Sequence, residues 1–288
     1  MRGETKEIND EARESASGSF IQLPNGITHY EMGGSESAEP VILIHGFSVP
    51  YFIYDPTFEF LSQSGFRVLR YDLFGRGYSD RPHARYNLDL FVKQLADLLD
   101  ALRFTSPVNL IGLSMGGPIA SAFTIRHPER VRKLVLIDPI GAKPIVLTPM
   151  LKAAKIPLVA EAVLSLVGSD SLVKSVAGDF FDTALVDHFI TRYKVQMQYQ
   201  GFKRAILSTV RNDMLGSFMD VYHILGKMDK EILMFWGRDD NAVPFEHSHN
   251  LRAALPHVEF HVIENCGHIP HYEKPEEVNP ILLEFLRK

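Results

Sequence analysis

The stretch Asn109-Leu110-Ile111-Gly112-Leu113-Ser114-Met115-Gly116-Gly117 decides the fold class of this chain. It places a serine in the pattern Gly-x-Ser-x-Gly, directly after an apolar run and directly before a helical one. In that context the serine stands on a sharp turn from strand to helix, with its hydroxyl at the edge of a sheet. The glycines allow the tight turn, and the amides that begin the helix favour negative charge beside the hydroxyl. The stretch therefore predicts Ser114 as a nucleophile.

Short apolar runs alternate with helical patterns on both sides of this stretch. Phe20–Leu23 and Ile27–Glu31 flank Pro24-Asn25-Gly26 and predict a hairpin. Further buried strands are predicted at Val41–His45, Arg67–Asp72, Val108–Leu113, Val131–Asp138, Ile232–Trp236 and Val258–Ile263. Helical spacing marks Leu88–Leu102 and Gly116–Arg126. Apolar strands that alternate with helices indicate an α/β fold: a mostly parallel central sheet with helices on both faces.

The alternation stops between residues 141 and 230, where the sequence shows helical segments and no convincing strand. Two apolar stripes stand out, and each is typical of local helix packing. They are Leu158, Val159, Ala162, Val163, Leu166 and Val167, and Leu185, Phe189, Tyr193 and Met197. We expect residues 141–230 to form an inserted helical cap over the carboxyl edge of the sheet, where open α/β folds bind ligands. Residues 19–140 and 231–288 then form the core.

Composition and net charge narrow the classes of function that this protein can have. A net charge of −5, with no basic block, argues against nucleic acid as a partner. No apolar run reaches the roughly 20 residues that span a bilayer, and the polar residues 1–18 are unlike a secretory signal. We expect a flexible lead there and a cytoplasmic protein. The single cysteine, Cys266, and the lack of a Cys/His cluster predict no disulfide, no metal and no cofactor.

Two backbone amides are candidates for an oxyanion hole, the set of donors that acyl transfer needs. One is the amide of Met115, next after Ser114. The other is that of Phe47, in the loop His45-Gly46-Phe47-Ser48 that follows an earlier strand. We expect His45 to shape this loop through hydrogen bonds and to take no part in catalysis.

A serine hydroxyl needs a base, and histidine has the suitable pKa. His268, in Asn265-Cys266-Gly267-His268-Ile269-Pro270, follows the last predicted strand on a glycine turn and is the best placed. His271 is its near competitor. His257 and His261 precede or lie within that strand, where surface or core roles are expected.

The base in turn needs a carboxylate to orient it. Two acids, Asp239 and Asp240, follow the strand that ends at Trp236, and Asp138 follows another. Spacing favours the loop after Trp236 and gives the chain order Ser, Asp, His. Local sequence does not separate Asp239 from Asp240.

From about Phe20 to its C-terminus the chain resembles the α/β-hydrolases. The motifs that carry the resemblance are His45-Gly46-Phe47, Asp72-Leu73-Phe74-Gly75-Arg76-Gly77-Tyr78-Ser79 with Pro82, Gly112-Leu113-Ser114-Met115-Gly116-Gly117, Gly237-Arg238-Asp239-Asp240 with Pro244, and Gly267-His268. The resemblance implies a catalytic triad of Ser114, Asp240 and His268. It implies Phe47 and Met115 as the oxyanion donors and leaves Asp239 exposed or structural.

Two further features receive structural interpretations. The glycine-rich loop from Asp72 to Ser79 lacks the lysine of a phosphate-binding loop, so we expect it to brace the sheet edge. Cys266, two residues before His268, is expected to be a small buried filler.

A serine at the nucleophile position disfavours the haloalkane dehalogenases and epoxide hydrolases of this superfamily, which use aspartate there. With no metal or cofactor motif, Ser114 is expected to attack a carbonyl and form an acyl-enzyme. The apolar cap suits an acyl chain. We therefore expect a carboxylic ester hydrolase of the serine carboxylesterase and monoacylglycerol-lipase-like branch. Its substrate would be a small ester with an apolar acyl part.

Two alternatives remain open. A carbon–carbon bond hydrolase of the aromatic meta-cleavage type shares the same triad and cap. It would need an arginine for a dienoate carboxylate, and Arg192 and Arg211 are the candidates. A non-catalytic ligand-binding member of the fold is the other alternative, but an intact triad argues against it.

Overall fold

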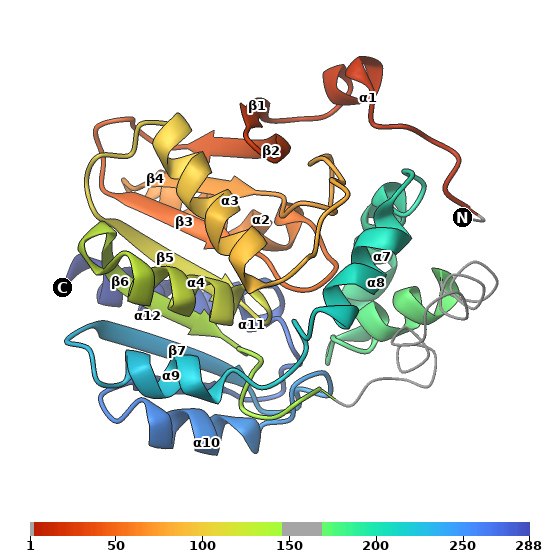
Figure 1. Cartoon of the computed structure of the whole chain (residues 1–288). Helices are drawn as coiled ribbons and strands as arrows, with labels where there is room; N and C mark the ends of the chain where they lie inside the picture. Colours follow the sequence, from red (N-terminus) through yellow and green to blue (C-terminus); the bar gives the residue numbers. More distant parts are fainter. Residues whose placement is uncertain (1–2, 146–168) are drawn as a thin grey trace.

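The computed structural model describes residues 3–145 and 169–288, which contain one eight-stranded sheet (Figure 1). The strand order is β1-β2-β4-β3-β5-β6-β7-β8. The strands are β1 (Ser19–Leu23), β2 (Gly26–Gly33), β3 (Pro40–Ile44), β4 (Arg67–Tyr71), β5 (Val108–Leu113), β6 (Val131–Ile137), β7 (Glu231–Gly237) and β8 (Glu259–Ile263). The hairpin β1-β2 is antiparallel and joins β4 antiparallel, and every other neighbouring pair is parallel. The predicted mostly parallel sheet is confirmed.

Alternating side chains along each inner strand pack on opposite faces of the sheet, because successive residues of a strand point to opposite sides. In β6, Leu134 and Leu136 pack on one face, and Val135 and Ile137 on the other. The first face is covered by α3 (Leu88–Ala101), α4 (Gly116–Arg126), α9 (Met219–Leu225) and α10 (His247–Ala254). The second face is covered by α2 (Asp55–Gln63), α11 (Pro270–Glu273) and α12 (Pro275–Arg287). Helices therefore cover both faces, as predicted.

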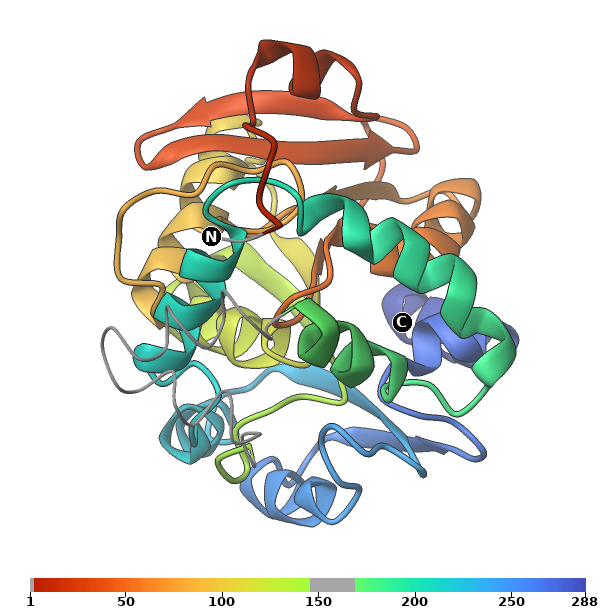
Figure 2. The ribbon, with the colours of Figure 1, turned by 90° about the vertical axis from the view of Figure 1, so that its right-hand side faces the viewer.

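Between β6 and β7 the described chain is helical. A helix at residues 169–177, η3 (Thr183–Leu185), α7 (Val186–Gln196) and α8 (Phe202–Arg211) lie beyond the carboxyl ends of the parallel strands (Figures 1 and 2). Phe189, Tyr193 and Met197 from the second predicted stripe are buried. The first stripe, Leu158 to Val167, lies outside the described residues. Helix α9, which the sequence placed in the cap, packs against α4 on the sheet.

The first residues of the chain contact the cap. Lys6 exchanges two backbone hydrogen bonds with it, donating to the Gln198 carbonyl at 2.9 Å and accepting from the Gln200 amide at 2.8 Å. Helix α1 (Asp10–Glu14) follows, and its Arg13 forms an ion pair with Asp80 at 2.7 Å. Short 3-10 turns lie at η1 (Tyr51–Tyr54) and η2 (Pro128–Arg130). None of the helices in the described ranges has the length and apolar character that crossing a membrane requires.

Leu134→Ala tests the packing of the central strand. Leu134 is fully buried, and removing such a side chain leaves a cavity that costs about 3 kcal/mol of the free energy of unfolding. Val195→Ala is the control, because Val195 is 38% exposed and its loss is expected to cost less than about 0.5 kcal/mol. Urea denaturation measures both; equal losses would contradict the assignment of Leu134 to the core.

Candidate active site

Ser114 lies on a strained turn between β5 and α4. Its φ is 53°, and its amide donates to the Ile137 carbonyl at 2.9 Å. A Cβ on Gly112 would lie 2.4 Å from the Gly116 carbonyl oxygen, and one on Gly116 would lie 2.2 Å from that of Ile44. Only glycine fits at either position, so the two glycines of the Gly-x-Ser-x-Gly pattern are required for the turn.

A cavity of about 280 Å³ lies beside this turn, between the sheet edge and the cap. Ser114, Phe47 and His268 line it, as does Asp179, which lies between the 169–177 helix and η3. Most of its other described lining residues are apolar, Ile140, Leu172, Val176 and Leu215 among them. Ser114 and His268, the predicted nucleophile and base, therefore line the same largely apolar cavity.

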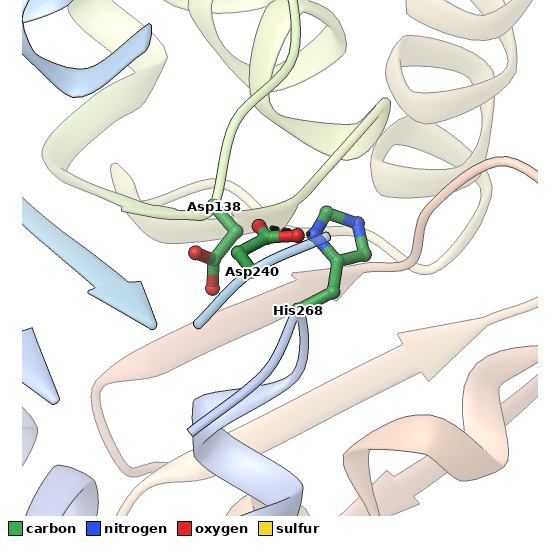
Figure 3. Close-up of side chains that lie close together, drawn as sticks. All are labelled: Asp138, Asp240 and His268. Carbon is green, nitrogen blue, oxygen red and sulfur yellow. Dashed lines mark hydrogen bonds and ion pairs between the residues drawn. The ribbon is translucent and has the colours of Figure 1, made fainter. Parts of the chain in front are cut away.

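His268 and Asp240 form a buried pair (Figure 3). Nδ1 of His268 donates to Oδ2 of Asp240 at 2.7 Å. The other oxygen, Oδ1, accepts from the amides of Ala242 and Val243, each at 2.8 Å. The carboxylate is therefore fixed by its own loop, and it fixes in turn the tautomer of the imidazole. Nε2 is left as the nitrogen that can accept a proton.

The pKa of His268 is raised above its ordinary value of 6.5. Burial opposes the charged imidazolium. The charge and hydrogen bond of Asp240 outweigh it, with smaller contributions from Asp179 and Glu273. The site thus stabilises the imidazolium that forms when the base takes a proton.

Asp138, the third candidate acid, lies beside Asp240 and does not bond to the imidazole (Figure 3). Its Oδ1 accepts from the Gly237 amide at 2.9 Å. Burial, and then the neighbouring charge of Asp240, raise its pKa well above the ordinary value, which favours its neutral form. Ligand atoms of Asp138, Asp240 and His268 lie within 4.8 Å of one another. Of the three, His268 and Asp240 are hydrogen-bonded to each other, so the His268 nitrogen nearest the acids already donates to Asp240.

The other candidates lie elsewhere. Asp239 is exposed, which separates it from the buried Asp240. His271 is buried against the Tyr54 ring, with its pKa lowered by burial to about 3. His257 is exposed, and His261 pairs with a surface glutamate, Glu259.

The loop that carries Phe47 runs directly against the nucleophile. A Cβ on Gly46 would lie 3.1 Å from that of Ser114. Within the described part of the chain, neither the Phe47 amide nor the Met115 amide donates a hydrogen bond. Both donors are therefore free for an oxyanion. His45 accepts from the Leu73 amide at 2.9 Å and shapes the loop, as predicted.

Two buried polar residues that the sequence interpretation missed hold this loop. Nε of Arg76 donates to the Phe47 carbonyl at 2.8 Å, and one of its terminal nitrogens donates to Thr209 of α8 at 2.9 Å. Gln196 of α7 donates to the Ser48 carbonyl at 2.7 Å. The cap therefore fixes the oxyanion loop directly. Arg76 belongs to the Asp72–Ser79 motif. The bracing role predicted for that motif is the sequence signal that could have pointed to Arg76.

Glu273, which the sequence interpretation also missed, links the cap to the loop that carries His268. Its Oε1 accepts from the Gly267 amide at 2.8 Å, and its Oε2 from the amides of Phe181 and Asp182 at 2.8 and 2.9 Å. Cys266 lies 3.7 Å from Oε1, and burial raises the pKa of its thiol far above the ordinary value. A thiol held protonated is unreactive, which agrees with the predicted filler.

Neither arginine proposed as a carboxylate anchor reaches the cavity. Arg192 pairs with Asp55 and lies over the Phe52 ring, 4.3 Å from its centre. Arg211 is likewise absent from the described lining residues, which include no arginine or lysine.

Residues 41–281 match the alpha/beta hydrolase family. The chain belongs to this family. It is 29% identical to a 2-hydroxy-6-oxononadienedioate/2-hydroxy-6-oxononatrienedioate hydrolase of Pseudomonas putida, over 95% of this chain and 98% of that one. It is 28% identical to a 2-hydroxy-6-oxo-6-phenylhexa-2,4-dienoate hydrolase of Burkholderia cepacia, over 96% and 98%. The structure of a meta-cleavage product hydrolase from Pseudomonas fluorescens IP01 superposes with a TM-score of 0.78 at 27% identity, covering 94% of this chain and 97% of that one.

These relatives correct the expectation of a carboxylic ester hydrolase of the carboxylesterase and lipase-like branch. They are named as hydrolases of 2-hydroxy-6-oxo dienoates and of meta-cleavage products, the class that the sequence interpretation kept as an alternative. The physical reason is that a triad of Ser114, His268 and Asp240 accounts only for attack on a carbonyl. It carries no information on whether oxygen or carbon leaves.

Asp240→Asn and Asp138→Asn separate the two buried acids. An amide at position 240 imposes the wrong tautomer on His268, so labelling of Ser114 by a fluorophosphonate should slow about 1,000-fold or more. Asparagine at position 138 keeps the shape of a side chain that makes no hydrogen bond to the imidazole, and labelling should stay within about threefold of wild type. Ser114→Ala is the blank and should take no label. The reverse order of the two asparagine variants would assign the acid to Asp138.

The labelling rate should rise with pH, because His268 must be neutral to accept the proton of Ser114. Its raised pKa places the midpoint above 6.5. A pH series of labelling rates measures it, with Asp138→Asn as a control that leaves the midpoint in place. A midpoint at or below 6.5 would contradict the charge arrangement around His268.

Proposed function

We propose that this protein hydrolyses the carbon–carbon bond next to the 6-oxo group of 2-hydroxy-6-oxo-dienoates, the products of aromatic ring meta-cleavage. The observation that carries the proposal is similarity over the whole length of the chain. The relatives with these substrate names cover 95% and 96% of it and are themselves covered to 98%. Segments of the core and the cap are therefore shared.

The site supports the first half of such a reaction. Ser114 adds to the ketone at carbon 6, and His268 takes the hydroxyl proton. The free amides of Phe47 and Met115 hold the oxyanion that forms. Asp240 stabilises the imidazolium through its 2.7 Å hydrogen bond. The apolar wall of the cavity suits the substituent that carbon 6 carries and excludes water from the ketone.

The second half needs a stable carbon leaving group. In the conjugated 2-hydroxy form, breaking the bond between carbons 5 and 6 would leave an electron pair on a vinyl carbon. Moving the proton of the 2-hydroxyl to carbon 5 first creates a 2-oxo group conjugated with carbon 5 through one double bond. That ketone then accepts the electron pair. The products are a 2-hydroxydienoate and, after water enters, a carboxylic acid.

The test is consumption of 2-hydroxy-6-oxo-6-phenylhexa-2,4-dienoate, followed by loss of its conjugated absorbance and by release of benzoate. Wild type should turn it over, and Ser114→Ala should release benzoate at least about 1,000-fold more slowly. Asp239→Asn is the matched control at an exposed acid and should retain full activity. Wild-type protein that takes the fluorophosphonate label but leaves this dienoate and its 6-alkyl analogues intact would refute the proposal.

A further inference from the structure

Among the described residues that line the cavity, Asp179 has a carboxyl group with no role in the proposed attack on carbon 6. Among the described lining residues, Asp179 and His268 are the only ones with an acidic or basic side chain. Within residues 3–145 and 169–288 the Asp179 carboxyl makes no hydrogen bond, and His268 is the positively charged group among them that lowers its pKa. A partly buried acid without a hydrogen-bond donor, inside a substrate cavity, is available to a substrate group.

The backbone holds Asp179 against the base. Its carbonyl oxygen accepts from the His268 amide at 2.7 Å. A Cβ on Gly267 would lie only 2.2 Å from the same oxygen, so this approach requires glycine. The cap therefore presents its acid on the His268 side of the cavity. The leaving group of the proposed reaction lies there too, because His268 exchanges protons with it.

The charges around Asp179 suit proton transfer near neutral pH. Burial raises its pKa to about 7. His268, from the loop after β8, lowers it, whereas Asp240, from the loop after β7, and Glu273 of α11 raise it. An acid–base group works best when its pKa lies near the working pH.

We propose that Asp179 is the residue that exchanges a proton with the 2-hydroxyl of the dienoate. This inference rests on the proposed function and assigns its tautomerisation step. The resting pair is an Asp179 carboxylate and a His268 imidazolium. Asp179 takes the 2-hydroxyl proton, the O–H electron pair forms the 2-oxo group, and the double bonds shift by one position. His268 gives its proton to carbon 5 and becomes the neutral base that Ser114 requires.

Asp179 also supplies the proton that is needed when the bond between carbons 5 and 6 breaks. His268 takes the Ser114 proton as the oxygen attacks carbon 6. When the bond between carbons 5 and 6 breaks, its electron pair moves through the chain to the 2-oxo oxygen. Asp179 returns its proton to that oxygen. The first product leaves as the 2-hydroxydienoate, Asp179 is again a carboxylate, and water releases the carboxylic acid from Ser114.

The experiment combines single-turnover loss of the dienol absorbance of 2-hydroxy-6-oxo-6-phenylhexa-2,4-dienoate with fluorophosphonate labelling at pH 8.5. In Asp179→Asn the absorbance loss should slow about 100-fold, while Ser114 labels at the wild-type rate. The wild-type pH profile should have an acid limb near pH 7, where Asp179 ionises. That limb should vanish in Asp179→Asn and return in Asp179→Glu. Asp187→Asn, an exposed acid of the same cap, is the control and should match wild type.

Two results would overturn the inference while leaving the proposed function intact. One is an Asp179→Asn variant that consumes the dienol at the wild-type rate. The other is equal slowing of consumption and labelling, since Asp179 would then act on the geometry of the triad. Failure of the wild type to consume the dienoate would instead refute the proposed function.

Discussion

The close contact between the Ser114 turn and the end of β3 is the constraint on which the site depends. Gly116 approaches the Ile44 carbonyl so closely that a Cβ would lie 2.2 Å from it. The same crowding brings Gly46, two residues beyond that carbonyl, against Ser114. Ser114, the predicted nucleophile, and the loop of Phe47, a predicted oxyanion donor, therefore share one tight contact between neighbouring parallel strands. His268 and Asp240, the predicted base and acid, reach this point from the loops after β8 and β7, because all these strands end at the same edge.

Features set by local patterns could be predicted from the sequence. The strand β5, the turn at Ser114 and α4 depend on neighbouring residues, and the predicted bounds of Val108–Leu113 and Gly116–Arg126 agree with the structure. The helices α2, α10 and α12 were not predicted. Pro280 lies inside α12 and argues against a helix there on sequence alone, and packing on the sheet stabilises all three helices. Local sequence did not separate Asp239 from Asp240, and only the family resemblance implied Asp240; in the structure Asp240 is buried and bonded to His268, whereas Asp239 is exposed.

Features that depend on contacts between distant segments could not be predicted. Glu273 and Arg76 are charged residues in ordinary helical or loop sequence, and their roles come from partners in the cap. Asp179 lies about 90 residues from His268 in the chain, yet its carbonyl accepts the His268 amide. Which group leaves after the attack on the carbonyl is harder still to predict from the sequence. Ester and carbon–carbon hydrolysis begin with the same attack on a carbonyl, so a triad of serine, histidine and aspartate fits both, and no local pattern in the sequence separates them.

The attachment of the cap by Glu273 couples the cap to the loop of His268. One carboxylate holds the cap backbone at Phe181 and Asp182 and also the Gly267 amide, next to His268. Separating this end of the cap from the core would break those bonds and remove a support of the His268 loop. The position of His268 therefore depends on the cap as well as on the strand that precedes it.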